Sequence, residues 1–313
     1  MKIKSNKIKF NSPIMWVLGG LLVFYVVFLL MLIVWGFFVT LKADLAINAV
    51  NPENVFRTNI FGLPKGMPWE WEWRNYAQVL EHIYADVDVK INGNFKRVRV
   101  ELMGMLKNTL FYTFGGAAVS TFLPLFVAYA TSKTDYKFSA IFDAVILIVM
   151  VIPIVGAYPS ELQVLNTLRL YDTWAGYYIQ RAHCISAYYL IFTAVFRSIP
   201  YTYSEAAYIE GAGEYTVMLR VIMPLARTVA MTVFLIFFIT IWNDYNTSLL
   251  YMPSHPALAY GIFYVLFKGN NALSQDVPMK FAGSFLLFSP ILVLFVLFRK
   301  VLMQNLSMGG LKE

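Results

Sequence analysis

Residues that form disulfides, bind metals or carry catalysis are scarce in this sequence. It has one cysteine, Cys184, in 313 residues, so no disulfide can form within the chain. The three histidines, His82, His183 and His255, are widely spaced, and no HExxH or Cys/His cluster is present. A GxxxxGKS/T motif is also missing, so the chain has no P-loop for ATP phosphates. We therefore expect no catalytic residue, no metal site and no cofactor in the chain itself.

Charged residues are few, at 14% against about 25% in an ordinary soluble domain. Apolar residues make up 59% and aromatic residues 17%, with a mean hydropathy of +0.60. This composition excludes a disordered chain, a nucleic-acid-binding arm and an ordinary soluble enzyme. A protein that crosses the lipid bilayer several times remains. The net charge of +7 fits basic residues on its cytoplasmic face, so no nucleic-acid partner is expected.

Six apolar segments are candidates for membrane helices, each of which needs about 20 residues. The predicted spans cover residues 14–39, 108–131, 138–159, 173–196, 228–252 and 281–298. We therefore predict an all-α membrane protein with six transmembrane helices and a mixed external loop after the first. A shorter apolar stretch at 253–267 begins with prolines and is predicted to be re-entrant.

The basic residues predict the orientation of these spans. An even number of spans places both termini on one side, where the lysines and arginines of the tails and of the turn after the second span also fall. By the positive-inside rule that side is the cytoplasm. The predicted organisation is a basic cytoplasmic tail (1–13), a first helix (14–40), an external loop (41–104), a five-helix core (105–303) with a cytoplasmic connector at 198–225, and a cytoplasmic tail (304–313).

The external loop has two patterned segments. Tryptophan and glutamate alternate in Trp69–Trp73, which is expected to lie on the membrane surface or, alternatively, to contact an external protein. Residues 87–100 alternate apolar and polar around Asn92-Gly93-Asn94, a pattern typical of two short strands. The loop is therefore expected to form a small subdomain.

The connector between the fourth and fifth spans has the pattern of a short helix that ends at a glycine. Pro200 and Thr202 suit the first turn of a helix, and the alanines at 206 and 207 favour its continuation. Gly211 and Gly213 permit a left-handed cap and a sharp turn. Pro224 then marks the return of the chain into the membrane. The small alanines leave room for the backbone of another protein.

This connector resembles the signature of the permease subunits of binding-protein-dependent ABC importers. That signature is Glu-Ala-Ala, three residues, Gly, nine residues and Ile-x-Leu-Pro. The matching positions are Glu205-Ala206-Ala207, Gly211 and Pro224, with Val221 and Met223 in the Ile and Leu positions. The resemblance covers about residues 70–313 and is greatest to the maltose-type second permease of the carbohydrate group.

The resemblance implies a mechanism driven by partner proteins. A coupling helix would dock in a groove of a cytoplasmic ATPase through the residues Glu205, Ala206, Ala207, Glu210, Gly211, Ala212, Gly213 and Pro224. The importer would contain a second permease, two ATPase subunits that bind ATP and magnesium, and an external solute-binding protein, in a bacterial cytoplasmic membrane. Its solute would be a carbohydrate, either an oligosaccharide or a polysaccharide fragment. Lys268, Asn270 and Asn271 would contact the binding protein, and the 304–312 tail would reach the ATPase.

Charged residues inside the predicted spans need a partner or a water-filled cavity, because a charge at the centre of a membrane helix costs about 3 kcal/mol. One of them, Asp244, lies within the cluster Trp242, Asn243, Asp244, Tyr245 and Asn246. Aromatic rings, amides and carboxylates suit a sugar path, although the cluster could instead mark the outer end of the span. Asp143 is expected at the membrane interface, and Arg181 is expected to extend outward.

Two other classes of membrane protein are alternatives. An ion-coupled secondary transporter of a small polar solute would use intramembrane acids such as Asp143 and Asp244, but the sequence has no visible inverted repeat. An intramembrane hydrolase would need a nucleophile beside a base, and Ser284 and Ser289 have no histidine near them in the sequence. An importer permease is therefore the expected function.

Overall fold

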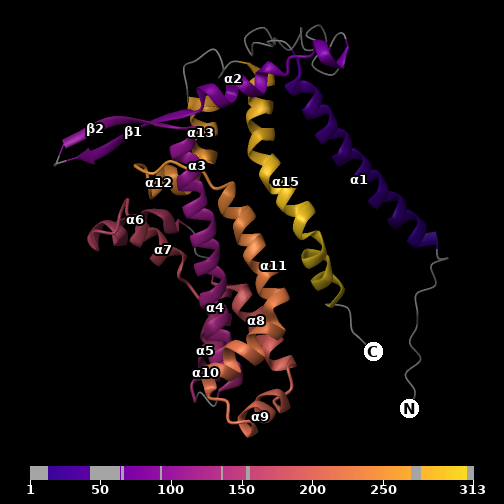
Figure 1. The fold of residues 1–313 in the computed structure, drawn as a ribbon, viewed down its shortest axis with the longest axis vertical. Coiled ribbons are helices and arrows are strands. Elements are labelled where there is room, and N and C mark those ends of the chain that lie inside the picture. The colour runs from indigo at the N-terminus through magenta and orange to yellow at the C-terminus, as the bar shows by residue number, and fades with distance from the viewer. Residues whose placement is uncertain are drawn as a thin grey trace. The chain divides into compact units, whose positions relative to one another are not determined.

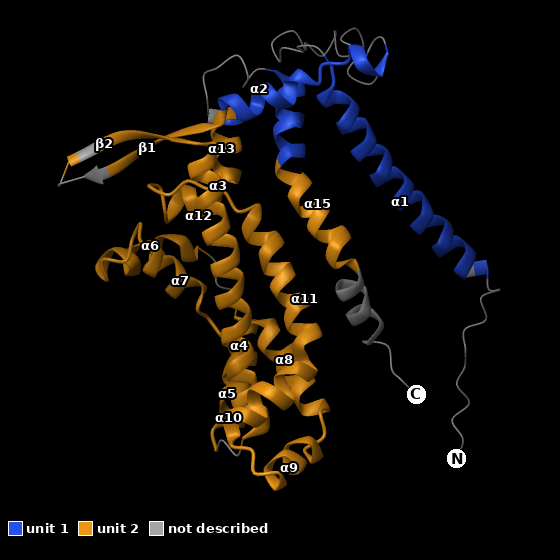
Figure 2. Ribbon diagram, in the orientation of Figure 1, with its two compact units in different colours: residues 1–82, 266–286 blue, residues 83–265, 287–313 orange. Residues whose placement is uncertain are grey.

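The structure is a computed structural model that describes residues 13–42, 64, 67–91, 94–134, 137–152, 156–268 and 276–308. Most of these residues are helical (Figure 1). The chain divides into two compact units, coloured separately in Figure 2: unit 1 is residues 1–82 and 266–286, and unit 2 is residues 83–265 and 287–313. The connector at 198–225 belongs to unit 2, which therefore contains most of the predicted site.

Unit 1 is built around the C-terminal end of a long apolar helix. Its helical elements are α1 (Pro13–Thr40), the 3-10 turn η2 (Pro68–Glu70), α2 (Arg74–His82) and the first part of α15 (Val277–Met308). Trp35 of α1 packs edge-on against Phe281 of α15, with ring centroids 5.6 Å apart. Asn75 of α2 donates its side-chain amide to the Thr40 carbonyl at 2.8 Å, which satisfies an acceptor at the end of α1.

The tryptophan stripe before α2 folds back onto α1. Trp71 lies against Phe38 and Trp73 against Phe37, with ring centroids 5.7 and 6.3 Å apart. Trp69 is 76% exposed. Two of the three tryptophans therefore pack against other residues of the chain. Neither predicted alternative, the membrane surface or an external protein, included these contacts, because the partner residues are distant in sequence.

Unit 2 begins with a two-stranded antiparallel hairpin, as the alternating pattern predicts. Strand β1 (Tyr84–Ile91) pairs with β2 (Asn94–Glu101), so that Asp86 faces Arg99 and Ala85 faces Val100. Arg99 donates to the Asp86 carboxylate at 3.0 Å on one face of the hairpin. Ala85 is fully buried on the other face, as the period of two residues in a strand requires.

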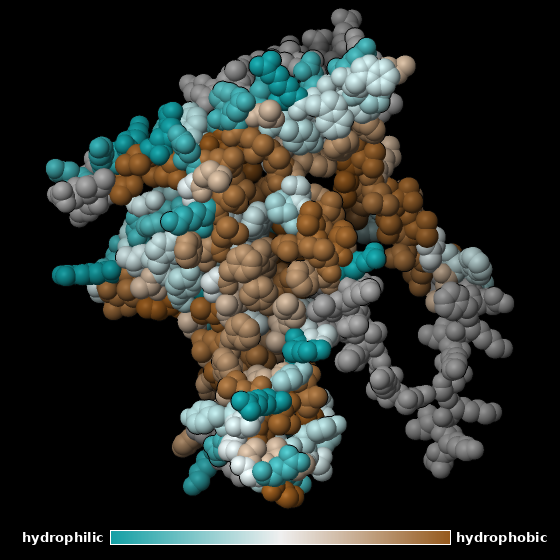
Figure 3. All heavy atoms as spheres, in the orientation of Figure 1, coloured by the Kyte–Doolittle hydropathy of each residue, from teal (hydrophilic) through white to brown (hydrophobic). Residues whose placement is uncertain are grey.

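The rest of unit 2 is helical. In chain order the elements are α3 (Leu102–Leu110), the π-turn η3 (Phe111–Gly115), α4 (Gly116–Lys133), α5 (Ser139–Val151), α6 (Ala157–Thr167), α7 (Trp174–Arg181), α8 (Ala187–Ser198), α9 (Thr202–Ile209), α10 (Glu214–Thr216), the π-turn η4 (Val217–Ile222), α11 (Met223–Trp242), α12 (Asn246–Leu250), α13 (Leu258–Phe263) and the π-turn η5 (Tyr264–Lys268), followed by the second part of α15. In Figure 3 hydrophobic atoms cover the long helices, whereas hydrophilic atoms gather over the hairpin and around α9.

Six long helices are predicted, but within the described residues four are long and apolar enough to cross a membrane. They are Met15–Thr40, Leu102–Lys133, Glu214–Trp242 and Val277–Arg299. The predicted third span contains the 13-residue α5 and the first three residues of α6. The predicted fourth span is not one helix, because residues 182–186 between α7 and α8 are not helical. Apolar composition alone does not distinguish a broken helix from a continuous one.

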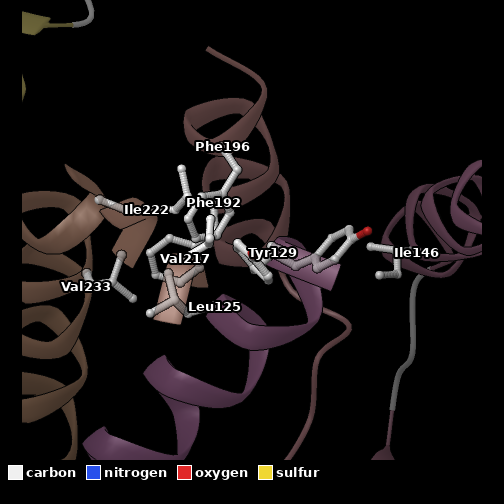
Figure 4. Packing of buried hydrophobic residues seen from close by; sticks show 12 residues of the cluster. Leu125, Tyr129, Ile146, Phe192, Phe196, Val217, Ile222 and Val233 are labelled. Carbon is white, nitrogen blue, oxygen red and sulfur yellow. The ribbon is translucent and has the colours of Figure 1, made fainter. Parts of the chain in front are cut away.

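A buried cluster joins α4, α8, η4 and α11 (Figure 4). Its largest members include Tyr129 of α4, Phe192 and Phe196 of α8, and Ile222 of η4, and both phenylalanines are completely buried. Tyr129 and Phe196 meet edge-on at 5.7 Å. Burying each such side chain stabilises the fold by roughly 2 kcal/mol. The two helices on either side of the connector therefore share one core.

A second contact holds α7 against the π-turn η3. A π-turn leaves backbone carbonyls without their usual helical partners. The hydroxyls of Tyr177 and Tyr178 donate to the carbonyls of Tyr112 and Phe111, at 3.0 and 3.1 Å. These bonds attach the short α7 to the middle of the predicted second span.

Candidate functional site: connector and polar cavity

The connector folds into the predicted helix, α9, and ends at the predicted glycine. Gly211 has a left-handed φ of 84°. Its amide donates to the Tyr208 carbonyl at 2.9 Å, and the next amide, that of Ala212, donates to the Ala207 carbonyl at 3.0 Å. This pair of bonds is a Schellman motif, which closes a helix with a left-handed residue. The helix begins without a side-chain cap or a capping box.

The second glycine of the connector behaves differently. Gly213 has an extended backbone with a φ of −77° at the start of α10. Among the described residues beyond the chain neighbours, no heavy atom lies within 4 Å of a Cβ built on either glycine, so the backbone conformation is what restricts substitution at these positions. Both glycines permit a left-handed conformation, and of the two it is Gly211 that adopts it.

The two faces of α9 have different surroundings. Ala207 packs against the buried cluster, and Ser204 is also buried. Glu205, Ala206 and Glu210 are exposed. The outer face thus presents two carboxylates and a small side chain. The sequence suggested that both alanines are open to another protein, but Ala207 faces the protein's own core.

The helix after the connector starts before Pro224. Helix α10, η4 and α11 form one continuous helix, Glu214–Trp242. A proline inside a helix removes an N–H donor and crowds the carbonyl four residues earlier. The π-turn directly before Pro224 provides the local widening that such a position needs. Pro224 therefore marks an irregularity within the helix rather than its beginning.

Polar contacts hold the start of the connector in place. The Lys133 ammonium donates to the Ile199 carbonyl at the end of α8. Asp143 of α5 accepts hydrogen bonds from Arg197 and Tyr189 of α8. The Asp143 side chain is 18% exposed and that of Arg197 is 55% exposed, so the pair lies at the surface of the unit, and its location at the membrane interface stays a prediction.

A second candidate site is a cavity of about 480 Å³ in unit 2. Its lining residues come from α6, from α7 and the segment after it, and from α12 with its preceding loop: Tyr158, Glu161, Gln180, Arg181, His183, Asp244, Asn246, Thr247 and Tyr251. These elements lie well away from α9 within unit 2 (Figure 1). The cavity is polar, and it contains two of the five predicted sugar-path residues.

The charged centre of this cavity is an ion pair between Arg181 and Asp244. Arg181 Nη2 lies 2.9 Å from Asp244 Oδ2, and the side chains are 23% and 20% exposed. The Thr247 hydroxyl donates to the same oxygen at 2.6 Å. The other oxygen, Oδ1, accepts from the backbone amides of Asn246 and Thr247 at the start of α12, at 2.9 and 3.1 Å. Arg181 therefore points inward, and the expectation that it extends outward is wrong.

The other three residues of the predicted cluster do not line the cavity. Trp242 is buried and donates its indole N–H to the Leu287 carbonyl at 3.1 Å. Asn243 donates to a carbonyl one turn back in α11. Tyr245 stacks on Phe263 with ring centroids 4.7 Å apart. The polar and aromatic run thus spreads over several surroundings, because the chain turns sharply after α11.

Sequence reasoning missed several residues of the cavity. Tyr158 and Glu161 lie on α6, and Gln180 and His183 lie at the end of α7 and just beyond it. Glu161 Oε2 accepts from Tyr251 at 2.5 Å and from Gln180 at 3.1 Å. No spacing in the sequence signals this group, because its members are brought together only by the fold.

Some predicted contacts fall outside the residues that the structure describes. Asn270, Asn271, the Lys268 side chain and Asn92 are among them. Within the described ranges, no three histidine, cysteine or acidic side chains gather as metal ligands.

Comparison with known proteins adds a family match. Residues 120–308 match the model of the family described as "binding-protein-dependent transport system inner membrane component". A trehalose transport system permease protein of Mycobacterium tuberculosis is 25% identical over 197 residues, covering 62% of this chain and 71% of that protein. A melibiose/raffinose/stachyose import permease protein of Bacillus subtilis is 24% identical over 216 residues, covering 68% and 78%.

A solved structure has a similar fold over nearly the whole chain. It is that of a bacterial ABC transporter involved in the import of the acidic polysaccharide alginate. The TM-score is 0.67 with 21% sequence identity, and the match covers 93% of this chain and 98% of that one.

Proposed function

Since the chain belongs to the family of binding-protein-dependent transport system inner membrane components, we propose that it forms, with a second permease, the path by which a carbohydrate enters the cell. The chain is a membrane-spanning, non-catalytic permease subunit of an ABC importer. Energy comes from partner ATPases, which bind ATP and magnesium, and the solute comes from an external binding protein.

The proposal of a carbohydrate substrate is supported by the relatives. The relatives that the chain matches include permease proteins for trehalose and for melibiose, raffinose and stachyose. The polar cavity supports the same class, because it combines amide, carboxylate and hydroxyl groups with tyrosine rings. We propose that the path passes this cavity, whose wall contains Asp244 and Asn246.

The observation that carries the proposal of ATPase coupling is the shape of α9. It is a short helix closed by a left-handed glycine and backed by the core, and its outer face is exposed. Ile209 at its end is 86% exposed, so the outer surface of the helix also offers an apolar contact to a partner. Residues 198–219 contain three glutamates and no lysine or arginine. A groove that combines basic and apolar residues would be complementary to this surface.

We also propose the membrane topology from the charge pattern. Six crossings place both termini and the 198–225 connector in the cytoplasm and residues 41–104 outside. In this arrangement α5 together with α6, and α7 together with α8, form the third and fourth crossings as interrupted helices. Lys268, Asn270 and Asn271 then face the binding protein, and the 304–312 tail faces the ATPase.

The ion-coupled alternative has less support. Both intramembrane acids that such a transporter would use, Asp143 and Asp244, are paired with arginines. A carboxylate that is already held by an arginine would have to break that pair before it could bind a coupling ion.

Co-isolation and ATP hydrolysis test the proposal. The complete importer is reconstituted in nanodiscs with its ATPase and binding protein, and solute-stimulated ATP hydrolysis is measured. Glu205→Lys and Gly211→Asp should abolish stimulation while leaving membrane insertion unchanged. Glu81→Lys, which changes an exposed acid of α2, is the matched control and should behave as the parent. Unchanged stimulation in both connector variants would refute the coupling role.

A further inference from the structure

We propose that Glu161, with Tyr158 and Gln180 beside it, binds the hydroxyl groups of an uncharged sugar unit in the polar cavity, and that Asp244 is a positioning residue that does not touch the solute. This inference rests on the proposed function as a carbohydrate permease. It names the residues that contact the solute and states that the solute is uncharged, and neither the family match nor the sequence motifs supply this.

Asp244 has no spare capacity for a solute. Its two oxygens already accept four hydrogen bonds, from the Arg181 guanidinium, the Thr247 hydroxyl and the amides of Asn246 and Thr247. A sugar hydroxyl could bind only by displacing one of these donors. The carboxylate therefore fixes the wall of the cavity, because it joins the end of α7 to the start of α12.

Glu161 is held in place but remains available. Its Oε2 atom accepts from the Tyr251 hydroxyl and the Gln180 amide. Within the part of the chain that the structure describes, no donor is bonded to the other oxygen, Oε1, and the side chain is exposed. A carboxylate is a strong acceptor for a hydroxyl donor. Because its rotamer is already fixed by two donors, little conformational entropy is lost when a solute binds.

The groups around Glu161 match the two sides of a sugar ring. The ring of Tyr158 is 59% exposed and lies beside that of the buried Tyr251, with centroids 6.5 Å apart, so it can offer an aromatic face to C–H groups. Gln180, His183 and Asn246 add hydrogen-bonding groups at the cavity wall. Its volume, about 480 Å³, is within the range of about 300–1,000 Å³ for small-molecule sites.

The break in the fourth predicted span also indicates a binding site. Residues 182–186 are irregular between α7 and α8, and His183 of this segment lines the cavity. At membrane depth, irregular backbone is tolerated where it lines a cavity or is buried in protein. Interrupted helices of this kind form the solute sites of other transporters.

The charge of the cavity selects against an acidic sugar. The positive charge of Arg181 is already compensated by Asp244, and its Nη2 atom is bonded to Asp244 and Thr247, so it attracts a solute carboxylate less than an unpaired arginine would. Glu161 carries no arginine or lysine partner among the described residues. A uronate placed against Glu161 would meet a like charge, whereas the hydroxyls of a neutral sugar would donate to it.

A protection experiment on the complete complex tests this proposal. The permease subunit keeps Cys184 as its one thiol, which is partly exposed beside His183 in the irregular segment at the cavity wall. Maltotriose, raffinose and cellotriose at high millimolar concentration are the neutral probes, and trigalacturonate is the anionic probe. At least one neutral probe should slow maleimide modification threefold or more, and trigalacturonate should not.

Second-site variants assign the effect to Glu161. Glu161→Ala should abolish protection by the neutral probe, and Glu161→Gln should weaken it while allowing trigalacturonate to protect. Glu101→Ala, which removes an exposed carboxylate at the end of β2, is the control and should change nothing.

Each outcome has a separate meaning. Loss of ATPase co-isolation from the parent complex would refute the proposed function. An intact complex with no protection by any neutral probe, with protection that survives Glu161→Ala, or with stronger protection by trigalacturonate would overturn the inference and leave the permease assignment in place.

Discussion

Removing the Asp244 carboxylate should destabilise unit 2 by about 4 kcal/mol. Asp244→Ala leaves Arg181 charged, mostly buried and unpaired, and breaking a buried ion pair in this way costs about 3–5 kcal/mol. Because both side chains are about one-fifth exposed, the lower end of that range applies. The substitution also removes the acceptor for the first amides of α12, which is a helix-capping loss of about 1 kcal/mol.

The two parts of this cost can be separated by a second substitution. Asp244→Asn keeps a side-chain oxygen that can accept from the α12 amides but removes the negative charge, so it should cost about 3 kcal/mol. Replacing both partners, as in Arg181→Met with Asp244→Leu, removes the unpaired charge. The double variant should therefore be less destabilised than Asp244→Ala alone.

Thermal unfolding of the purified chain in detergent is the assay. Asp244→Ala should lower the apparent melting temperature by roughly 8 °C, at about 2 °C per kcal/mol. The control is Asp88→Ala, which breaks the solvent-exposed pair with Arg97 on the hairpin and should cost at most about 1 kcal/mol. Equal effects of the two alanine variants, or additive effects of the two cavity substitutions, would contradict the structural role of the pair.

Other substitutions test the connector and the packing of α7. Gly211→Ala should weaken ATPase co-isolation, since a φ of 84° costs an L-residue about 1 kcal/mol; Gly213→Ala, at a φ of −77°, should not. Lys133→Met frees the carbonyl at the end of α8, so amide exchange in α9 should become faster while the yield of inserted protein is unchanged. Gly116→Ala would place a Cβ 2.3 Å from a tyrosine hydroxyl of α7 and should lower the melting temperature, whereas Gly19→Ala, with no atom within 4 Å, should not.

The connector and the hairpin were predictable because their conformation is decided locally. A left-handed cap at Gly211 depends on a glycine directly after a run of helix-forming residues, and those residues are adjacent in sequence. The hairpin follows from alternation on both sides of a turn. Gly213 shows the limit of this reasoning, because a glycine permits a left-handed conformation without requiring it.

The polar cavity was only partly predictable because its contacts are distant in sequence. Asp244 was identified from the free-energy cost of a charge inside a membrane span, but its partner Arg181 was expected to extend outward. The bond between Glu161 and Tyr251 joins residues 90 positions apart, and neither lies in a recognisable pattern. The interruption at 182–186 was missed for a similar reason, since an apolar stretch has the same composition whether its helix is continuous or broken.

The two candidate sites are connected by the helices that flank the connector. Helix α8 enters the connector and α11 leaves it, and their near ends share the buried cluster of Phe196 and Ile222. Beyond their far ends, Arg181 and Asp244 form the ion pair of the cavity. A displacement of α9 would therefore approach the ion pair along α11, whereas along α8 it would first meet the irregular segment at 182–186. Packed helices shift between discrete arrangements rather than deform continuously. The irregular segment at 182–186 is then the place where such a shift can be absorbed, directly beside the cavity wall.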